Sequence, residues 1–210
     1  MNIGKGLKAQ SVDAEVNTTL LLRGLKDTLS GNKPLLTDEQ AVAALSQLQS
    51  EVRKKQDEVR KTQGDKNLKE GTAFLAANKT KDGVVTLPSG LQYKILTAGT
   101  GPKPTAADTV VCQYRGTLID GTEFDSSAKH GGPATFPVGR IIKGWTEALQ
   151  LMPVGSKWQL FIPPDLAYGS NGAGNLIGPN ATLIFDLELM SIKQPNAPSP
   201  APAPAPAPNK

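Results

Sequence analysis

The stretch GTLIDGTEFDSS, residues 116–127, places an aromatic ring and a carboxylate side by side at Phe124 and Asp125. Its Asp-Gly pair at 120–121 is typical of a tight type I′ turn, which predicts a β-hairpin whose returning arm carries both residues. No catalytic partner for the carboxylate stands out nearby in the sequence. On residue type alone, Asp125 can equally be an acid that caps a turn. The stretch therefore leaves open whether the site reacts with a ligand or only binds one.

Other groups suited to chemistry are few, because the chain holds one cysteine, Cys112, and one histidine, His130. A single cysteine excludes an intrachain disulfide and a cysteine-based metal site. Within a strand-like run it is expected to be a small core residue. His130 has no second histidine and no cysteine near it, so we expect a solvated loop residue rather than an acid, a base or a metal ligand. The sequence predicts neither a metal nor a cofactor.

The composition of the 210-residue chain excludes two classes of partner. Its net charge is +4, and its basic side chains are interleaved with acidic ones. Nucleic-acid binding needs a basic patch, so no nucleic-acid partner is expected. No run approaches the ~18 apolar residues of a membrane span, and Met1 is not followed by an apolar signal core. We therefore expect a chain that is soluble as given, or one from which a signal has been removed.

The elements that must position these groups fall into three segments, and the first, residues 1–86, has helical spacing. Its first apolar series, which ends before Gly31, is Leu20, Leu21, Leu25 and Leu29. Glycine is suited to the position just after a helix. A second helix is expected to begin at Thr37, because Gln40 three residues later completes a capping box. An apolar stripe suited to a partner helix follows at Ala41, Leu45, Leu48 and Val52.

After Val52 the sequence is polar on nearly every side, which is typical of a helix that crosses solvent between two domains. A continuous helix from Thr37 to about Asn78 is roughly 60 Å long at ~1.5 Å per residue, with Gly64 as its weakest point. Two or three short helices bury little surface alone, so we expect residues 1–86 to form a homodimer through them. In the alternative, the helices fold back on the second domain, which the long polar stretch disfavours.

Residues 87–193 change to strand-like runs separated by clusters of Gly, Pro, Asn and Asp. The runs are LQYKIL, DTVVCQYRGTLI, SKWQLFI and ATLIFDLELMSI, and only residues 144–152 have the pattern of a short helix. This predicts an α+β domain, in which an antiparallel sheet packs on one short helix. Residues 194–210 are rich in Pro and Ala and are expected to form a disordered, extended tail outside any core.

Three segments resemble, in the same order, the FKBP family of peptidyl-prolyl cis/trans isomerases: VVCQYRGTLIDGTEFDSS, IIKGWTEALQLMPVGSKWQLFIPPDLAYG and LIGPNATLIFDLEL. The helical segment before them resembles the macrophage infectivity potentiator (Mip) subgroup of Gram-negative bacteria. The resemblance implies a V-shaped homodimer in which amino-terminal helices interlock and a long helix carries each FKBP domain. It also implies a prolyl isomerase that acts on unfolded or partly folded proline-containing polypeptides, with chaperone-like binding in the dimer cleft. Macrocyclic FKBP inhibitors are expected to bind the same pocket.

The resemblance also assigns the residues of that pocket. The positions that match its catalytic lining are Tyr114, Phe124, Asp125, Phe136, Ile141, Ile142, Trp145, Tyr168 and Phe185. Trp145 matches the floor beneath the proline ring, and Asp125 matches a carboxylate that polarises the site and orients Tyr114. The N–H of Ile142 and the hydroxyl of Tyr168 match the donors that hold substrate carbonyls. The matching substrate-binding rim is Ala134, Ala167, Leu176 and Ile177.

Residue type alone gives a plainer interpretation, in which Phe136 and Phe185 are ordinary core residues of a sheet. The sequence also departs from the family at the rim. Ala134 stands where many members have a phenylalanine, His130 where many have an arginine, and Ala173 where a histidine is found. These departures are expected to change substrate preference and inhibitor affinity and to leave the proline floor intact.

Alternatives to a working isomerase stay open at this point. The pocket can have become a receptor for proline peptides, although the complete set of pocket residues argues against decay. The Pro/Ala tail can be a tether to the cell envelope or an inert spacer. By analogy with the subgroup, the expected location is the periplasm or outer cell envelope of a Gram-negative bacterium, and the alternative is the cytoplasm.

Overall fold

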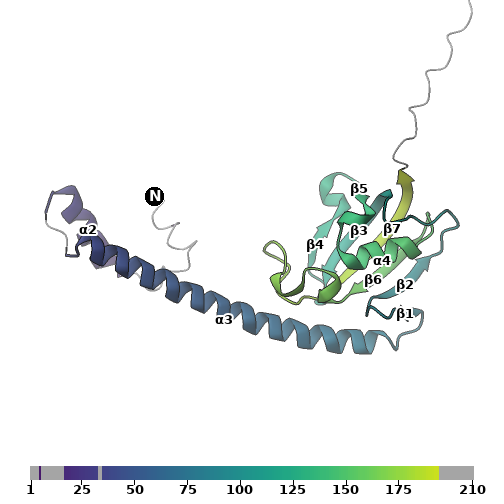
Figure 1. The fold of residues 1–210 in the computed structure, drawn as a ribbon, viewed down its shortest axis with the longest axis horizontal. Coiled ribbons are helices and arrows are strands. Elements are labelled where there is room, and N and C mark those ends of the chain that lie inside the picture. Colours follow the sequence, from purple (N-terminus) through teal and green to yellow (C-terminus); the bar gives the residue numbers. More distant parts are fainter. Residues whose placement is uncertain (1–4, 6–16, 33–34, 194–210) are drawn as a thin grey trace, which may run out of the picture. The chain divides into compact units, whose positions relative to one another are not determined.

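The computed structural model describes residue 5 and residues 17–32 and 35–193 (Figure 1). The predicted Pro/Ala tail lies outside this range. The described residues form two compact units that divide between Lys61 and Thr62, inside one long helix. The sequence had suggested a boundary after that helix, at residue 86. The difference arises because the last turns of the helix pack against the second unit.

The first unit contains α2, Thr18–Leu29, and the beginning of α3, Asp38–Asn78. Gly31 follows α2 with a φ of 68°, as a residue just beyond a helix often does. The predicted capping box is present at the start of α3. The N–H of Thr37 donates to Gln40 Oε1 at 3.0 Å, and the N–H of Gln40 donates to Thr37 Oγ1 at 3.3 Å. The predicted helix ends are therefore confirmed.

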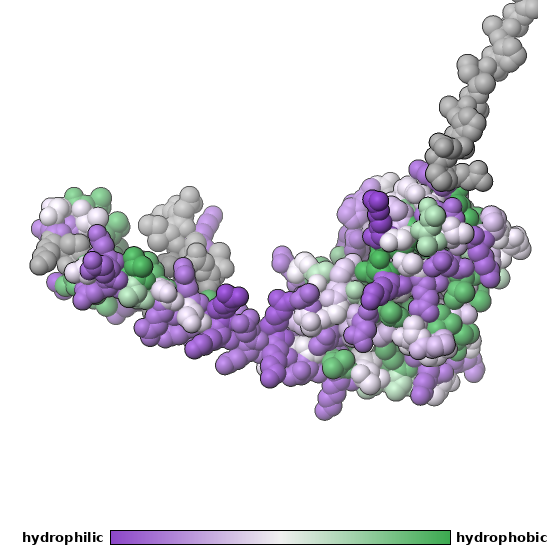
Figure 2. Space-filling model, in the orientation of Figure 1, coloured by the Kyte–Doolittle hydropathy of each residue, from purple (hydrophilic) through white to green (hydrophobic). Residues whose placement is uncertain are grey.

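The apolar residues of this unit are largely exposed. No residue of α2 is buried, and Leu45 on α3 is 58% exposed. The other exposed apolar side chains around α2 and the start of α3 are Leu20, Leu21, Leu22, Leu25, Leu29, Leu35, Leu36 and Val42. Figure 2 shows hydrophobic residues on α2 and a hydrophilic stretch along the middle of α3. Within the described part of the chain, these side chains keep 43–79% of their surface exposed, so much of their apolar area is not buried.

The second unit is a seven-stranded antiparallel sheet with one short helix, α4, Lys143–Leu151, across one face (Figure 1). The strands are β1 Val84–Thr86, β2 Gln92–Thr97, β3 Thr109–Leu118, β4 Glu123–Ser126, β5 Ala134–Pro137, β6 Lys157–Ile162 and β7 Leu183–Lys193. Their order is β1-β2-β6-β7-β3-β4, and β5 pairs with β3. The predicted α+β class is confirmed. Strands β1 and β5 are too short to stand out in the sequence.

The core lies between α4 and the sheet. Along β3, the alternate residues Val110, Cys112 and Tyr114 are buried, as expected for a strand with one face covered. The same cluster includes Trp145, Ala148 and Leu149 of α4, together with Leu160, Ile162, Leu183, Phe185, Leu187 and Leu189 from β6 and β7. The single helix and the two central strands therefore hold the residues that line the site described below.

The hairpin between β3 and β4 differs from its prediction in the turn. The N–H of Gly121 donates to the carbonyl of Leu118 at 3.0 Å, and the N–H of Leu118 donates to the carbonyl of Thr122 at 2.9 Å. A type I′ turn needs positive φ at both central residues. Gly121 has a φ of 87°, but Asn180 is the one described non-glycine residue with a positive φ, so Asp120 does not. Asp120 instead accepts a hydrogen bond from the N–H of Thr122 at 2.9 Å, which favours a longer loop with a single left-handed glycine.

The last part of α3, residues 62–78, packs on the face of the sheet away from α4. The ring centroid of Phe74 lies 5.9 Å from that of Phe161 on β6. The side chain of Gln92 on β2 donates to the carbonyl of Leu75 at 2.9 Å and accepts from Asn78 Nδ2 at 3.0 Å. Gln92 and Asn78 are both buried. The predicted solvent-crossing helix is therefore wrong for residues 62–78.

Glycines explain why the sequence pattern missed this contact. The buried residues of α3 are Gly64, Gly71 and Asn78, which repeat every seven residues and so share one side of the helix. A Cβ atom at Gly71 would collide with the hydroxyl of Thr182, and one at Gly64 would lie 3.2 Å from Cβ of Pro179. Gly64, expected to be the weakest point of the helix, is a point of close approach. Within the described residues, no helix is long and apolar enough to cross a membrane.

Candidate active site

A pocket of about 770 Å³ opens beside α4 on the side of the sheet that carries the core. Every position that the sequence assigned to the catalytic lining borders it: Tyr114, Phe124, Asp125, Phe136, Ile141, Ile142, Trp145, Tyr168 and Phe185. These residues come from β3, β4, β5, β7, α4, the two residues before α4 and the loop after β6. Ala167 of the predicted rim borders the pocket as well. Segments far apart in the chain thus converge on one cavity.

Trp145 stands at the centre of an aromatic cluster and is 4% exposed. Its ring centroid lies 5.1 Å from that of Phe185 and 5.4 Å from those of Tyr114 and Phe136, with interplanar angles of 80°, 77° and 83°. Such edge-to-face arrangements are the favoured geometry of aromatic pairs. The cluster forms an apolar base for the pocket, set by interlocking rings.

Gly116 on β3 makes room for the rings at the side of this cluster. Phe124 and Phe185 meet edge to face, with centroids 5.4 Å apart. A Cβ atom at Gly116 would lie 2.5 Å from Cζ of Phe124 and 2.7 Å from Cε1 of Phe185. No side chain fits there without displacing a ring. Gly116 is therefore needed to place Phe124, eight residues later in the same hairpin.

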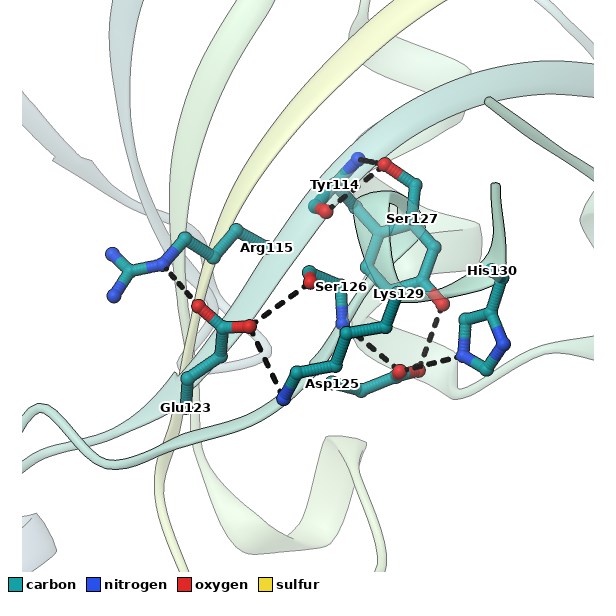
Figure 3. Close-up of polar contacts among 8 residues, drawn as sticks. All are labelled: Tyr114, Arg115, Glu123, Asp125, Ser126, Ser127, Lys129 and His130. Carbon is teal, nitrogen blue, oxygen red and sulfur yellow. Dashed lines mark hydrogen bonds and ion pairs between the residues drawn. The ribbon is translucent and has the colours of Figure 1, made fainter. Parts of the chain in front are cut away.

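Asp125 is the pocket carboxylate that contacts Tyr114 and His130 (Figure 3). The hydroxyl of Tyr114 donates to its Oδ2 at 2.7 Å, and the N–H of Ser126 donates to its Oδ1 at 2.9 Å. His130 Nε2 lies 2.8 Å from the same Oδ1, although the His130 side chain is 61% exposed. The expected solvated loop histidine is therefore solvated on one side only, and its other side contacts the pocket carboxylate.

The surroundings fix the protonation of these groups at neutral pH. Burial pushes the pKa of Asp125 upward, but the hydrogen bonds from Tyr114, His130 and Ser126 outweigh burial and hold that pKa below its usual value. Burial, together with the bond to Asp125, raises the pKa of Tyr114 well above its usual value. Burial and the negative charge of Asp125 raise the pKa of Tyr168. Asp125 is therefore ionised, and the phenols of Tyr114 and Tyr168 stay protonated.

Neighbouring polar contacts hold the strands that carry Tyr114 and Asp125. Ser127 is 1% exposed, and its Oγ accepts from the N–H of Tyr114 at 3.1 Å and lies 3.2 Å from the carbonyl of Tyr114. On the outer side, Glu123 contacts Arg115 Nε at 2.7 Å and Lys129 Nζ at 3.2 Å (Figure 3). The bonds from Arg115, Ser126 and Lys129 lower the pKa of Glu123 to about 2. Glu123 thus stays ionised beside Asp125, and the two carboxylates share Ser126, whose N–H bonds Asp125 while its hydroxyl bonds Glu123.

Hydrogen-bond donors at the pocket remain available to a ligand. Within the described part of the chain, neither the N–H of Ile142 nor the hydroxyl of Tyr168 has a protein acceptor. Ile142 precedes α4, and its carbonyl accepts from the N–H groups of Trp145 and Thr146 at 3.0 and 3.1 Å. This arrangement fixes the backbone of Ile142 while its N–H stays unused. The indole Nε1 of Trp145 is buried and likewise has no partner.

The predicted rim is only partly brought to the pocket. Ala134 and Ile177 pack at the edge of the core, and Leu176 is 52% exposed and borders a separate groove beside α3. The structure instead brings in polar residues that sequence reasoning missed: Arg140, Lys143, Asp165, Gly169, Ser170 and Asn171. Arg140 and Lys143 flank the pair Ile141–Ile142, so their closeness along the chain was the available signal.

Metal chemistry finds no support within the described residues, where no group of His, Cys, Asp and Glu side chains is placed to hold a metal ion. Cys112 is fully buried, and burial raises the pKa of its thiol to about 12. A thiol in that state is inert as a nucleophile. The pocket can therefore bind and polarise a ligand with hydrogen bonds, the Asp125 carboxylate and apolar rings.

Comparisons with known proteins agree with this architecture. Residues 101–190 match the family described as FKBP-type peptidyl-prolyl cis-trans isomerase, and residues 1–95 match the domain amino terminal to it. The chain is 51% identical to the outer membrane protein MIP of Legionella longbeachae, over 92% of this chain and 82% of that protein. It is 46% identical to the peptidyl-prolyl cis-trans isomerase Mip of Coxiella burnetii, over 92% and 84%. The crystal structure of FkpA from Escherichia coli matches with a TM-score of 0.73 at 34% identity, covering 91% of this chain and 88% of that one.

An antiparallel sheet packed on one helix, with a pocket floored by an indole, agrees with the isomerase family matched by residues 101–190. The protein belongs to the FKBP-type peptidyl-prolyl cis-trans isomerases, and it carries the amino-terminal domain found in the Mip and FkpA relatives.

Proposed function

We propose that the pocket isomerises prolyl bonds in unfolded or partly folded polypeptides and so accelerates their folding. We further propose that the enzyme works as a homodimer, joined by its amino-terminal helices, which also holds such chains in the manner of a chaperone. One observation supports the catalytic assignment above all. A buried indole is ringed by three aromatic side chains, and two unused hydrogen-bond donors border the same pocket.

The chemistry of the prolyl bond explains why such a site suffices. The barrier of ~18–20 kcal/mol arises from amide resonance, which is lost when the bond twists. The twisted amide separates less charge than the planar one, so an apolar pocket that excludes water favours it over the ground state. Each ~1.4 kcal/mol of that difference raises the rate tenfold. No nucleophile or proton transfer is required, which fits the groups that the pocket offers.

Roles for individual residues follow from their positions. Trp145 receives the proline ring, with Phe136 and Phe185 at its sides. The N–H of Ile142 and the hydroxyl of Tyr168 hold carbonyls of the bound chain on either side of the twisting bond. Asp125 orients Tyr114 through their 2.7 Å hydrogen bond and supplies the negative end of the field across the pocket. The sequence assigned the same roles through family resemblance.

A protease-coupled assay with a tetrapeptide that contains one Xaa-Pro bond tests this proposal. Asp125→Ala and Tyr168→Phe are expected to lower kcat/KM by about three- to thirtyfold, since each removes one polar contact worth about 1–2 kcal/mol. Lys157→Ala, an exposed substitution outside the pocket, is the control. Equal rates in all three folded variants would show that these residues do not carry catalysis. A macrocyclic FKBP inhibitor should compete with the peptide and shield Trp145 from a fluorescence quencher.

The dimer is supported by the leucines of α2, none of which is buried within the described part of the chain. A second copy of the chain would cover them and supply the apolar contacts that two short helices lack. Two pockets in one particle can also engage one unfolded chain twice, which raises avidity without any new contact. Sedimentation or light scattering on the full chain tests the assembly directly, and a monomer at micromolar concentration would rule it out.

The proposed location is the periplasm or outer envelope of a Gram-negative bacterium. The support is the name of the Legionella longbeachae relative, an outer membrane protein at 51% identity. Fractionation of cells that produce the natural protein tests the location, and recovery in the cytoplasmic fraction favours the alternative.

A further inference from the structure

We propose that the last part of α3 belongs to the active-site architecture, and that Asn67 and Asn180 are positioning residues that hold the loop after Tyr168 at the pocket. This inference rests on the proposed function, because the loop acts on whatever chain the pocket binds. The loop runs from Gly169 to Ala181, and its first residues, Gly169, Ser170 and Asn171, border the pocket. Its last residues face α3.

Two side-chain amides join the loop to α3. Nδ2 of Asn67 donates to the carbonyl of Pro179 at 2.7 Å, and Nδ2 of Asn180 donates to the carbonyl of Gly64 at 3.4 Å. The bonds run in opposite directions, one from the helix and one from the loop. Gln63 Nε2 donates to Oδ1 of Asn67 at 2.7 Å, which turns the amide of Asn67 so that its N–H group faces Pro179. The contact is therefore directional rather than a general apolar packing.

The backbone of the loop carries the contact toward the pocket. The N–H of Asn180 donates to the carbonyl of Gly169 at 2.8 Å, so the same residue bonds both α3 and the pocket end of the loop. Ala173 and Ile177 close the middle of the loop through a pair of backbone bonds of 2.8 and 3.2 Å. A chain of bonds thus links Gly64 on α3, through Asn180, to the residue that follows Tyr168.

Asn180 has the backbone conformation that this link requires. Its φ is 53°, in the left-handed region that asparagine tolerates better than most residues. Gly178 and Pro179, which precede Asn180, lie close to the helix. A Cβ atom at Gly178 would lie 3.0 Å from Nδ2 of Asn67, and one at Gly64 would lie 3.2 Å from Cβ of Pro179. Small residues on both sides bring the two amides within bonding distance.

The loop is therefore expected to affect substrate binding more than the catalytic step. Trp145, Tyr114 and Asp125 are fixed by the core and by β3 and β4, so they stay in place if the loop is released. A released loop must be ordered again each time a substrate binds, and that ordering weakens binding. Loss of either amide is therefore expected to raise KM for a peptide about three- to tenfold, in line with one lost hydrogen bond, while kcat changes less than twofold.

The test uses the full chain and three substitutions, each followed by peptide kinetics and thermal unfolding. Asn180→Gly removes the amide but keeps the positive φ at no steric cost. Asn67→Ala removes the donor to Pro179. Asn67→Asp keeps the volume of asparagine and points an oxygen at the Pro179 carbonyl. Lys69→Ala, an exposed residue on the same helix, is the control and should match the wild-type chain.

The order of the KM values of the two Asn67 variants distinguishes a positioning role from a packing role. If Asn67 acts through its hydrogen bond, Asn67→Asp raises KM at least as much as Asn67→Ala. If it merely fills space, Asn67→Asp is the milder change, and the proposal is overturned. The double variant Asn67→Ala/Asn180→Gly should raise KM by less than the product of the single effects, because both amides hold one loop.

Hydrogen exchange of the amides of Ala173 and Ile177 gives a second readout. Both should exchange faster in Asn67→Ala and Asn180→Gly, while the core amide of Leu187 should not change. Wild-type KM and unchanged exchange in both variants would overturn the inference even if they are slightly less stable. The proposed function fails in a different way, because the wild-type chain would then show no isomerase activity at all.

Discussion

The two parts of α3 behave in opposite ways. Residues 38–61 carry the apolar stripe, yet none of its members is buried and Leu45 is 58% exposed. Residues 62–78 are mostly polar, yet Gly64, Gly71 and Asn78 are the buried residues of the helix. Apolar periodicity marks where a helix needs a partner, and small residues mark where it already has one at close range. The comparison places the second part in the isomerase domain and supports the proposal that the first part pairs with another chain.

Removal of the second part should have the largest effect. A chain that begins at residue 62 keeps Phe74 on Phe161 and the partners of Gln92, whereas one that begins at residue 79 loses them. The shorter chain uncovers an aromatic ring and leaves a buried amide unpaired, which costs about 1–3 kcal/mol for the amide alone. We expect its free energy of unfolding in urea to fall by about 3–5 kcal/mol once the lost ring packing is included.

The chain that begins at residue 62 is the matched control for that experiment. It should unfold at nearly the urea concentration of the isomerase domain in the full protein. If both shortened chains are equally stable, residues 62–78 are only a spacer, and the proposed difference between the two parts of α3 is wrong.

Substitution of the apolar stripe should have the next largest effect. Leu45→Glu changes an exposed residue in the single chain, so an isolated subunit should tolerate it. In a dimer the carboxylate would be buried without a partner, which costs several kcal/mol, on the order of 3–5. We expect the variant to be monomeric by light scattering, with wild-type activity on a tetrapeptide.

Val59→Glu provides the control on the same helix. Val59 is 71% exposed and lies beyond the stripe, so this variant should remain a dimer. A dimeric Leu45→Glu variant would move the interface away from α3.

A methyl group in the glycine seam should have a smaller but diagnostic effect. Gly71→Ala places a Cβ atom against the hydroxyl of Thr182, so the gain in helix propensity is outweighed by overpacking of about 1–3 kcal/mol. Gly24→Ala on α2 is the matched control, because no atom lies within 4 Å of its added Cβ. We expect Gly24→Ala to stabilise its helix by about 1 kcal/mol. Thermal unfolding that shows the same gain in both variants would contradict close approach at Gly71.

Sequence reasoning succeeded where a residue's neighbours in the chain decide its structure. The capping box of Thr37 and Gln40, the glycine after α2 and the alternation along β3 are local patterns, and each predicted its element correctly. The turn at Asp120 failed because an Asp-Gly pair supports more than one hairpin loop. The side-chain bond to Thr122 that decides between them leaves no mark in the pattern.

The site was predictable only through resemblance, because its members come from five strands and helices that meet in space. Phe136 and Phe185 have the alternation of ordinary core residues, and nothing in the local sequence directs them toward Trp145. The contact of His130 with Asp125 has no clear signal in the sequence, and Asn67 and Pro179 are 112 residues apart in the chain. A single amide on a polar helix looks like any solvated residue until the partner loop is seen.

The last prediction compares substrates rather than variants, and we expect its effect on peptides to be close to zero. The full protein and the chain that begins at residue 62 both keep the pocket and the loop contacts of Asn67 and Asn180. Deletion of residues 1–61 should therefore leave kcat/KM on a tetrapeptide unchanged within twofold. The same deletion removes the exposed leucines and with them the second pocket of the proposed dimer. A tetrapeptide fills one pocket and is not affected by that loss, whereas a whole unfolded chain held at two points is.

Refolding of a protein limited by prolyl isomerisation should therefore slow severalfold at equal pocket concentration. The Leu45→Glu variant should slow it equally, because it removes the dimer and nothing else. If the deleted chain refolds such a protein as fast as the full enzyme does, the first part of α3 has a purpose other than pairing two pockets, even if the dimer itself is real.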